Sequence, residues 1–265
     1  MKPFVDRYLM PRIKSLTRNG AVQITIVHAA QESWTATSLK SGRATQHGEA
    51  FGLIQRRARM SYQLGEQPIW HGYADAGLDP YPLDTGRDAT RTPLQVSTPD
   101  QIGRLFTQVT VERKPHLVVE VGTAFGVSGM YWLAGLEFNG SGHLLTFEPN
   151  DAWAETALAN LAAIGSRFEL VTGTFEDNLA AVDAQGATID IAFIDAIHTR
   201  AIVMSQFELV RSRSAPGALI FFDDIDFSDD MHACWTSLAS DAQFAAAAEI
   251  GRVGLLELRR DAPPG

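Results

Sequence analysis

The feature that most constrains the fold is an alternation of two patterns that begins near residue 97. Short apolar and β-branched runs, each of a length typical of strands, occur at 117–121, 143–147, 168–172, 189–194, 218–222 and 254–258. Helical patterns separate several of these runs, at 152–163, 200–210 and 231–239. Strands and helices that alternate along a chain form a mostly parallel sheet with helices on both faces. We therefore predict an α/β fold, with ligands bound beyond the carboxyl ends of the strands.

The chain before residue 97 has a different character. Polar stretches that contain Gly and Pro alternate there with short helical patterns. We therefore predict two parts: an N-terminal lid or oligomerisation segment at 1–96 and the α/β domain at 97–265. Aromatic side chains are frequent in the first part, at Trp34, Tyr62, Trp70, Tyr73 and Tyr81. Two interpretations stay open for them: they line a substrate pocket, or they anchor irregular chain onto the core.

Charge and cysteine content exclude several classes of function. The chain has 31 Asp and Glu against 22 Lys and Arg, a net charge of −9, which argues against nucleic acid or an anionic membrane as the main partner. Cys234 is the only cysteine, which excludes an intramolecular disulfide and a cysteine zinc site and leads us to expect a cytoplasmic protein. We expect no membrane span, because no apolar run approaches the roughly 20 residues that cross a bilayer. We expect no export either, because the short apolar patch near the N-terminus contains Gln23 and His28 and its basic lead-in is interrupted by Pro11.

A glycine-containing turn follows the first apolar run, in the sequence EVGTAFG at 120–126. Glycines allow a chain to turn sharply and admit a ligand against bare backbone. The N–H groups of the helix that follows favour an anionic group in the turn by about 0.3–1 kcal/mol. The spacing is E-x-G-x-x-x-G, not the G-x-G-x-x-G of dinucleotide-binding proteins, and a single glycine turn serves only geometry in many α/β proteins.

Polar residues at the strand ends give this turn a more specific chemistry. Glu120 is placed to counter the ammonium of an amino-acid moiety, and Ser128 to donate to a carboxylate. Glu148, at the end of the second run, is placed to accept two hydrogen bonds from a ribose diol. Phe175 in the sequence GTF at 173–175 either flanks an adenine ring or belongs to the core.

Three carboxylates follow the next two runs. Asp195 ends the fourth run, and Asp223 and Asp224 end the fifth. Neighbouring parallel strands lie about 5 Å apart, so these acids are expected to converge on one small volume. Like charges so close together raise the pKa of one of them, and a divalent cation such as Mg²⁺ removes that cost. The alternative is a structural role, as helix caps or in a salt-bridged cluster.

The chain from residue 94 to the C-terminus resembles the class I S-adenosylmethionine-dependent methyltransferases. More narrowly, it resembles the metal-dependent catechol O-methyltransferases and their relatives that methylate hydroxyls of antibiotic sugars. EVGTAFGVS resembles the cofactor turn of that family, and TFEPN at 146–150 resembles its ribose-binding strand end. The resemblance implies a Rossmann-like, mostly parallel seven-stranded sheet with helices on both faces.

The resemblance also implies roles for individual residues. The residues predicted to bind the cofactor are Glu120, Gly122, Thr123, Gly126, Ser128, Glu148, Gly173, Thr174, Phe175 and Asp195. Asp195, Asp223 and Asp224 match the layout of the family's metal site and are predicted to bind Mg²⁺.

His198, three residues beyond Asp195, is the predicted general base. An unperturbed imidazole has a pKa of about 6.5 and can accept a proton near neutral pH. The catechol enzymes commonly have a lysine there, and many sugar-modifying relatives have an acid at the position of Ile197. Because this chain lacks that acid, either His198 takes the proton or the metal alone acidifies the hydroxyl. A third possibility is that His198 only caps a helix or contacts the cofactor.

The resulting prediction is a Mg²⁺-assisted O-methyltransferase that acts on a small-molecule hydroxyl, either catechol-like or on a sugar of a natural product. A homodimer is expected from the resemblance alone. Three rival hypotheses stay open: a metal-independent methyltransferase, a non-catalytic cofactor-binding module, and an NAD(P)-dependent oxidoreductase. The last is disfavoured because Glu120 stands where the first dinucleotide glycine is required.

Overall fold

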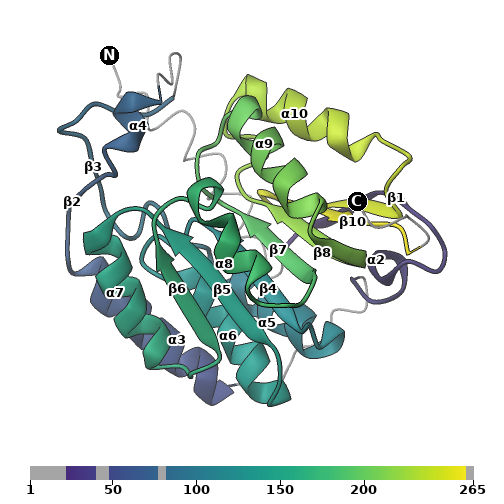
Figure 1. Cartoon of the computed structure of the whole chain (residues 1–265), viewed down its shortest axis with the longest axis horizontal. Coiled ribbons are helices and arrows are strands. Elements are labelled where there is room, and N and C mark those ends of the chain that lie inside the picture. Colours follow the sequence, from purple (N-terminus) through teal and green to yellow (C-terminus); the bar gives the residue numbers. More distant parts are fainter. Residues whose placement is uncertain (1–21, 40–47, 77–81, 261–265) are drawn as a thin grey trace.

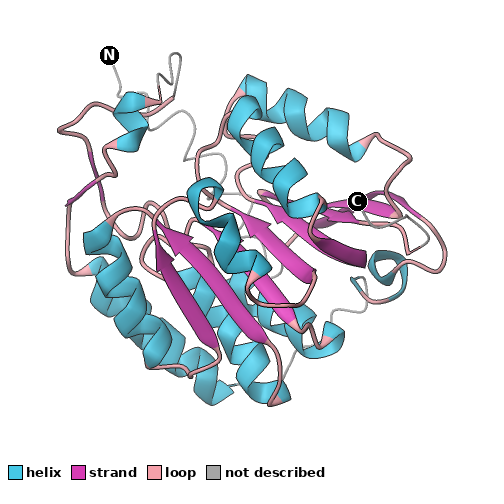
Figure 2. Cartoon of the chain, viewed as in Figure 1, coloured by secondary structure: helices cyan, strands magenta, loops and turns pink. Residues whose placement is uncertain are grey.

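The computed structural model describes residues 22–39, 48–76 and 82–260. Within these ranges an eight-stranded sheet passes through the molecule, with helices on both faces (Figure 1, Figure 2). The strands are β1 (Ile24–Ala29), β4 (Leu117–Val121), β5 (His143–Glu148), β6 (Phe168–Thr172), β7 (Ile189–Ile194), β8 (Ser214–Phe222), β9 (Ala246–Ile250) and β10 (Val253–Glu257). A separate two-stranded ribbon joins β2 (Gln67–Pro68) to β3 (Thr90–Arg91). The α/β prediction is therefore confirmed.

The strand order is β1-β9-β10-β8-β7-β4-β5-β6. The five strands from β8 to β6 are parallel, whereas the pairs β1–β9, β9–β10 and β10–β8 are antiparallel. Eight strands are present where seven were predicted, because β1, from the segment before residue 97, adds to the edge of β9. The alanines of β9, AAAEI, gave no strand pattern that the sequence analysis recognised.

The helices are α2 (Trp34–Thr37), α3 (Gly48–Tyr62), α4 (Gly72–Asp75), α5 (Asp100–Arg113), α6 (Val127–Asn139), α7 (Asp151–Ala162), α8 (Leu179–Asp183), α9 (Arg200–Arg211) and α10 (Asp229–Ala239), with a 3₁₀ turn, η2, at Glu176–Asn178. Three of the helices that follow parallel strands start at side-chain caps. Asn150, Thr199 and Ser228 accept backbone N–H groups at the starts of α7, α9 and α10. None of the helices in the described ranges is long and apolar enough to span a bilayer.

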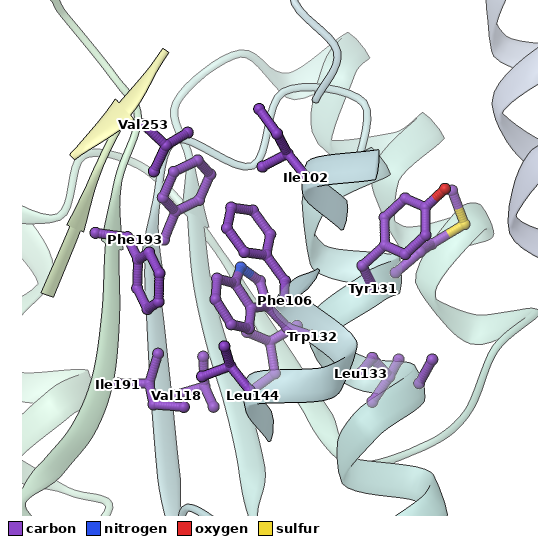
Figure 3. Close-up of a cluster of buried hydrophobic side chains, with 14 of the residues drawn as sticks. Ile102, Phe106, Val118, Tyr131, Trp132, Leu133, Leu144, Ile191, Phe193 and Val253 are labelled. Atoms are coloured by element: carbon purple, nitrogen blue, oxygen red, sulfur yellow. The ribbon is translucent and has the colours of Figure 1, made fainter. Parts of the chain in front are cut away.

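The core has two layers, one on each face of the sheet. Helices α3, α5 and α6 cover one face, where Phe106 stacks on Trp132 with ring centroids 4.0 Å apart (Figure 3). Helices α8, α9 and α10 cover the other face. Alternate residues of a strand point to opposite faces, so Val118 of β4 joins the first layer whereas Val119 and Val121 join the second. The same alternation directs the side chain of Glu120, the polar residue of β4, toward the first layer.

Candidate active site

A cavity of about 1150 Å³ lies at the carboxyl ends of the parallel strands. This is the place where open α/β sheets bind ligands. Among the predicted site residues, those that line the cavity are Gly122, Glu148, Gly173, Thr174, Phe175, Asp195, His198, Asp223 and Asp224. Four others do not line it: Glu120, Thr123, Gly126 and Ser128. The structure thus brings together the predicted cofactor end and the predicted acidic end in one space.

The turn after β4 depends on glycine at residue 122. Gly122 has φ +92°, a conformation that side chains rarely adopt, and an ideal Cβ there would lie 2.0 Å from the carbonyl oxygen of Asp195. The N–H groups of Gly122 and Thr123 both donate to the carbonyl of Phe147, at 3.1 and 3.0 Å. The glycine is therefore required first by the close approach of the β7 loop, and the same turn forms one wall of the cavity.

The side chain of Glu148 is buried, and it also lines the cavity. Its Oε2 accepts the N–H of Ala124 at 2.7 Å, and its Oε1 accepts the N–H of Asn150 at 2.9 Å. Burial raises the pKa of this carboxyl to about 7, although the two backbone hydrogen bonds oppose the shift. A carboxylate has about four lone-pair sites, so both oxygens keep capacity to accept hydroxyl donors from a ligand.

Glu120 lies beneath the turn instead of in the cavity. Its position in β4 directs it to the α6 face, where Oε2 accepts the hydroxyl of Thr146 at 2.7 Å and Ser128 forms a further hydrogen bond. The side chain is fully buried, and burial raises its pKa to about 7. In this arrangement the side chains of Glu120 and Ser128 hold each other, and contact between Glu120 and a cofactor ammonium stays an untested prediction.

The loop after β6 closes the end of the cavity next to Glu148. Gly173 has φ +133° and donates its N–H to the carbonyl of Glu148 at 3.0 Å. The hydroxyl of Thr174 donates to Asp177 at 2.7 Å. Phe175 packs edge-on against Phe147, with ring centroids 5.4 Å apart, and is buried in the second core layer while it also lines the cavity. Phe175 is thus a core residue, as one of the two sequence-based interpretations held, and contact with an adenine ring stays a prediction.

The three predicted metal ligands do converge. The backbone N–H of Asp223 donates to the carbonyl of Ile194, so the loops after β7 and β8 leave the sheet side by side. Burial, together with the nearby carboxylate of Asp223, raises the pKa of Asp195 well above its usual range. Asp224 has φ +50°, a left-handed conformation that turns the chain directly after the strand.

Arg252 lies against these acids, although no sequence pattern pointed to it. It occupies the turn between β9 and β10, where its carbonyl accepts the N–H of Ile225 at 3.1 Å. Its Nη2 donates to Oδ2 of Asp223 in a short contact, and its Nη1 lies 3.6 Å from Oδ1 of Asp224. Burial alone would lower the pKa of Arg252, but the surrounding carboxylates raise it above its usual range. A single arginine in a short turn gave no local signal, because only the strand order places it here.

The arrangement does not fit the predicted Mg²⁺ site. A guanidinium already compensates the charge of Asp223 and Asp224, and a divalent ion at these carboxylates would lie beside a buried positive charge. No group of three or more His, Cys, Asp or Glu side chains in the described ranges is arranged to hold a metal ion. The reason for the difference is the pairing of β10 with β8, which brings the β9–β10 turn to the ends of the parallel strands.

His198 faces the same acids from the end of the loop that leads to α9, two residues before the helix begins. Its Nε2 lies 3.7 Å from Oδ1 of Asp195 and 3.9 Å from Oδ2 of Asp224. Its ring is tilted against that of Phe227, with centroids 5.1 Å apart, and the side chain is 13% exposed. The predicted base is therefore held between carboxylates at the edge of the cavity.

An apolar wall built from the chain before residue 97 closes the remaining side of the cavity. It comprises Tyr62, Ile69, Trp70, Tyr73, Leu94 and Val96. The hydroxyl of Tyr73 donates to the carbonyl of Ala196 at 3.2 Å and so ties α4 to the loop after β7. Of the two interpretations for the early aromatics, pocket lining therefore holds for Tyr62, Trp70 and Tyr73. Trp34 lies elsewhere, where its N–H donates to Glu257, and Tyr81 lies outside the described residues.

Comparison with known proteins agrees with this geometry. A family model described as a methyltransferase domain matches residues 119–225. A protein of Mycobacterium leprae (strain Br4923), provisionally named as an O-methyltransferase, is 32% identical over 114 residues; the match covers 42% of this chain and 50% of that protein. The chain thus spans about half the length of the curated relatives it matches.

Solved structures with the same fold include two O-methyltransferases. TomG of Streptomyces achromogenes, crystallised with S-adenosylmethionine, has a TM-score of 0.54 and 19% identity, with coverage of 86% of this chain and 96% of that one. A Bacillus cereus O-methyltransferase in complex with S-adenosylhomocysteine has a TM-score of 0.54 and 16% identity, with coverage of 86% and 98%.

The fold is that of the class I methyltransferases, as the resemblance implied. Within it, residues 119–225 match the family model described as a methyltransferase domain. That stretch contains the predicted cofactor and metal residues, whereas Arg252 and the aromatic wall lie outside it.

Proposed function

We propose that this chain is an S-adenosylmethionine-dependent O-methyltransferase that acts on the hydroxyl of an apolar aromatic small molecule. The observation that carries the proposal is one continuous cavity with a ribose-type acceptor, Glu148, at one end and His198 at the other. The family match and the O-methyltransferase names of the relatives support the reaction class.

The residues at the Glu148 end fit the cofactor. Glu148 presents a nearly buried carboxylate to the cavity, as a ribose diol requires. The turn at Gly122 leaves no room for a side chain, and Phe175 forms an apolar edge where an aromatic base can pack. When bound, the cofactor supplies a methyl group that its sulfonium activates for transfer.

At the other end, His198 is placed to take the proton of the acceptor hydroxyl. Two acidic side chains face its Nε2, Asp195 at 3.7 Å and Asp224 at 3.9 Å. The cavity walls would hold the acceptor beside the cofactor, which would remove the entropy cost of bringing the two reactants together.

The acceptor class follows from the apolar wall. Trp70 and Tyr73 meet edge to face, with ring centroids 6.3 Å apart, and Leu94 and Val96 extend the apolar surface. Such a wall favours a flat, apolar ring over a sugar, because sugar hydroxyls buried there would lose hydrogen bonds with water. We therefore favour a catechol- or phenol-like acceptor among the two predicted kinds. A homodimer and a cytoplasmic location remain predictions.

Metal dependence is the second question. The sequence left open a Mg²⁺-assisted and a metal-independent reaction. We favour the metal-independent form, because Arg252 contacts the carboxylates that the metal would need.

The test uses the full chain in two measurements. Calorimetric titration with S-adenosylhomocysteine is expected to give saturable binding without added metal. Transfer of labelled methyl groups is then assayed with catechols, phenols and simple glycosides, and the phenolic acceptors are expected to react fastest. Binding without transfer to any acceptor would favour the non-catalytic module, and absence of binding would contradict the proposal.

A further inference from the structure

The acidic end of the cavity already contains a positive charge. Arg252 contacts Asp223 and Asp224, and its side chain is only 18% exposed while it still lines the cavity. Ile225 fixes the backbone of Arg252 through the hydrogen bond to its carbonyl. The guanidinium is therefore held both by its ion pairs and by its main chain.

We propose that the guanidinium of Arg252 is the resident cation of this site, in the place where the resembling metal-dependent enzymes hold a divalent ion. Its second role, contact with the acceptor oxygen, rests on the proposed methyl transfer. Its first role, as the cation that occupies this position, does not rest on the proposed methyl transfer. That role can be tested without cofactor or acceptor.

The donor geometry leaves N–H groups for an acceptor oxygen. A guanidinium has five N–H donors. One N–H of Nη2 donates to the carboxylate of Asp223, whereas Nη1 lies 3.6 Å from Oδ1 of Asp224, beyond ordinary hydrogen-bond length. The guanidinium can thus keep its ion pairs and still donate toward the cavity. It stays charged at every pH at which the protein works.

The chemistry of the step differs from metal assistance. A guanidinium stabilises negative charge on the acceptor oxygen by hydrogen bonding but cannot coordinate it as a Lewis acid. The hydroxyl proton passes to His198, an oxygen lone pair forms the new C–O bond, and the pair of the breaking C–S bond stays on sulfur. The site therefore depends on both Arg252 and His198.

Occupancy is tested with Mn²⁺ alone, whose electron paramagnetic resonance signal reports binding. We expect no binding to the wild-type chain up to about 1 mM, the weak end of protein cation sites. Arg252→Ala leaves the carboxylates uncompensated and is expected to gain a Mn²⁺ site, which Arg252→Ala with Asp223→Asn should lose. Arg113→Ala is the matched control, because Arg113 is also partly buried but donates to the carbonyl of Gly217, away from the acids.

Micromolar Mn²⁺ binding by the wild-type chain would overturn the proposal, as would an Arg252→Ala protein that binds S-adenosylhomocysteine but gains no Mn²⁺ site. If Arg252→Ala does not fold, Arg252→Lys replaces it in the activity test below, and the wild-type titration still decides occupancy.

The role toward the acceptor is tested by transfer rates. Wild-type transfer is expected to change less than about twofold in excess chelator, and Arg252→Ala to lose about 100-fold or more in kcat at unchanged cofactor affinity. Arg252→Lys should retain part of the rate. Loss of wild-type activity in chelator, with recovery on Mg²⁺ addition, would contradict the inference and leave the proposed methyl transfer intact. Lack of cofactor binding would instead contradict the proposed function and leave the Mn²⁺ result valid.

Discussion

The carbonyl oxygen of Asp195 lies 2.0 Å from the point where a Cβ on Gly122 would stand. No L side chain fits there without a backbone shift, and Gly122 also has φ +92°. The first loop of the cofactor end and the first acid of the opposite end are thus in direct backbone contact.

This contact predicts a large effect for Gly122→Ala. The strained φ and the clash with backbone together are expected to lower the free energy of unfolding by about 3–5 kcal/mol, measured by urea denaturation. Gly140→Ala is the matched control, because Gly140 has φ +65° with nothing within 4 Å of its Cβ position. It should cost only about 1 kcal/mol. Equal losses for the two variants would contradict the assigned contact.

Glu148→Gln tests the ribose acceptor. The substitution keeps the shape of the side chain but removes the negative charge that strengthens hydrogen bonds from a diol. We expect S-adenosylhomocysteine to bind at least about tenfold more weakly, equivalent to about 1.4 kcal/mol, in calorimetric titration. Glu155→Gln, on the exposed surface of α7, should bind as the wild type does. Unchanged affinity for Glu148→Gln would place the ribose elsewhere.

Glu120 predicts a pH dependence of stability. Its pKa is about 7 in the folded chain against 4.5 as the ordinary value, so the folded state holds a proton that the unfolded state releases between these values. Its contribution to stability is therefore present below pH 4.5 and is lost as the pH rises to about 7. From pH 5 to 8, Glu120→Gln should gain about 2.5 kcal/mol relative to the wild type in urea unfolding. Parallel profiles would show that Glu120 does not titrate in this range.

His198→Gln separates proton transfer from binding. Loss of the general base is expected to reduce kcat by about 10²–10⁴-fold while affinity for S-adenosylhomocysteine changes less than about twofold. His116→Gln serves as the control, since that side chain is 88% exposed and lies at the opposite end of the parallel strands. A matching fall in cofactor affinity for His198→Gln would assign the residue to binding instead.

The sequence predicted the parallel core because its signals are local. Continuous apolar runs at 117–121 and 189–194 mark buried parallel strands, and the polar residues after them mark the cavity edge. Glu148, Asp195 and His198 line the cavity, at the strand ends where their position in the chain predicted a site, and their roles stay predictions. The alanines of β9 carried no such signal, because alanine is common in helices and depleted in strands.

What the sequence could not predict depends on contacts between distant residues. Glu120 was predicted to contact the cofactor, which stays untested, but the alternation of side chains along β4 turns it toward α6 and away from the cavity lining. Arg252 reaches the acids only because β10 is paired between β8 and β9. No local sequence pattern shows which face of the sheet a strand residue points to, or in which order the strands pair.

The pairing of β1 with β9 has a consequence for any shortened chain. Residues 24–29 cover the backbone donors and acceptors of β9, and β9 in turn supports the hairpin that carries Arg252. A fragment that begins at residue 97, the predicted start of the α/β domain, would expose β9 as a bare edge strand. Such an edge invites pairing with another molecule. The proposed site would then be weakened by self-association at a position remote from its chemistry.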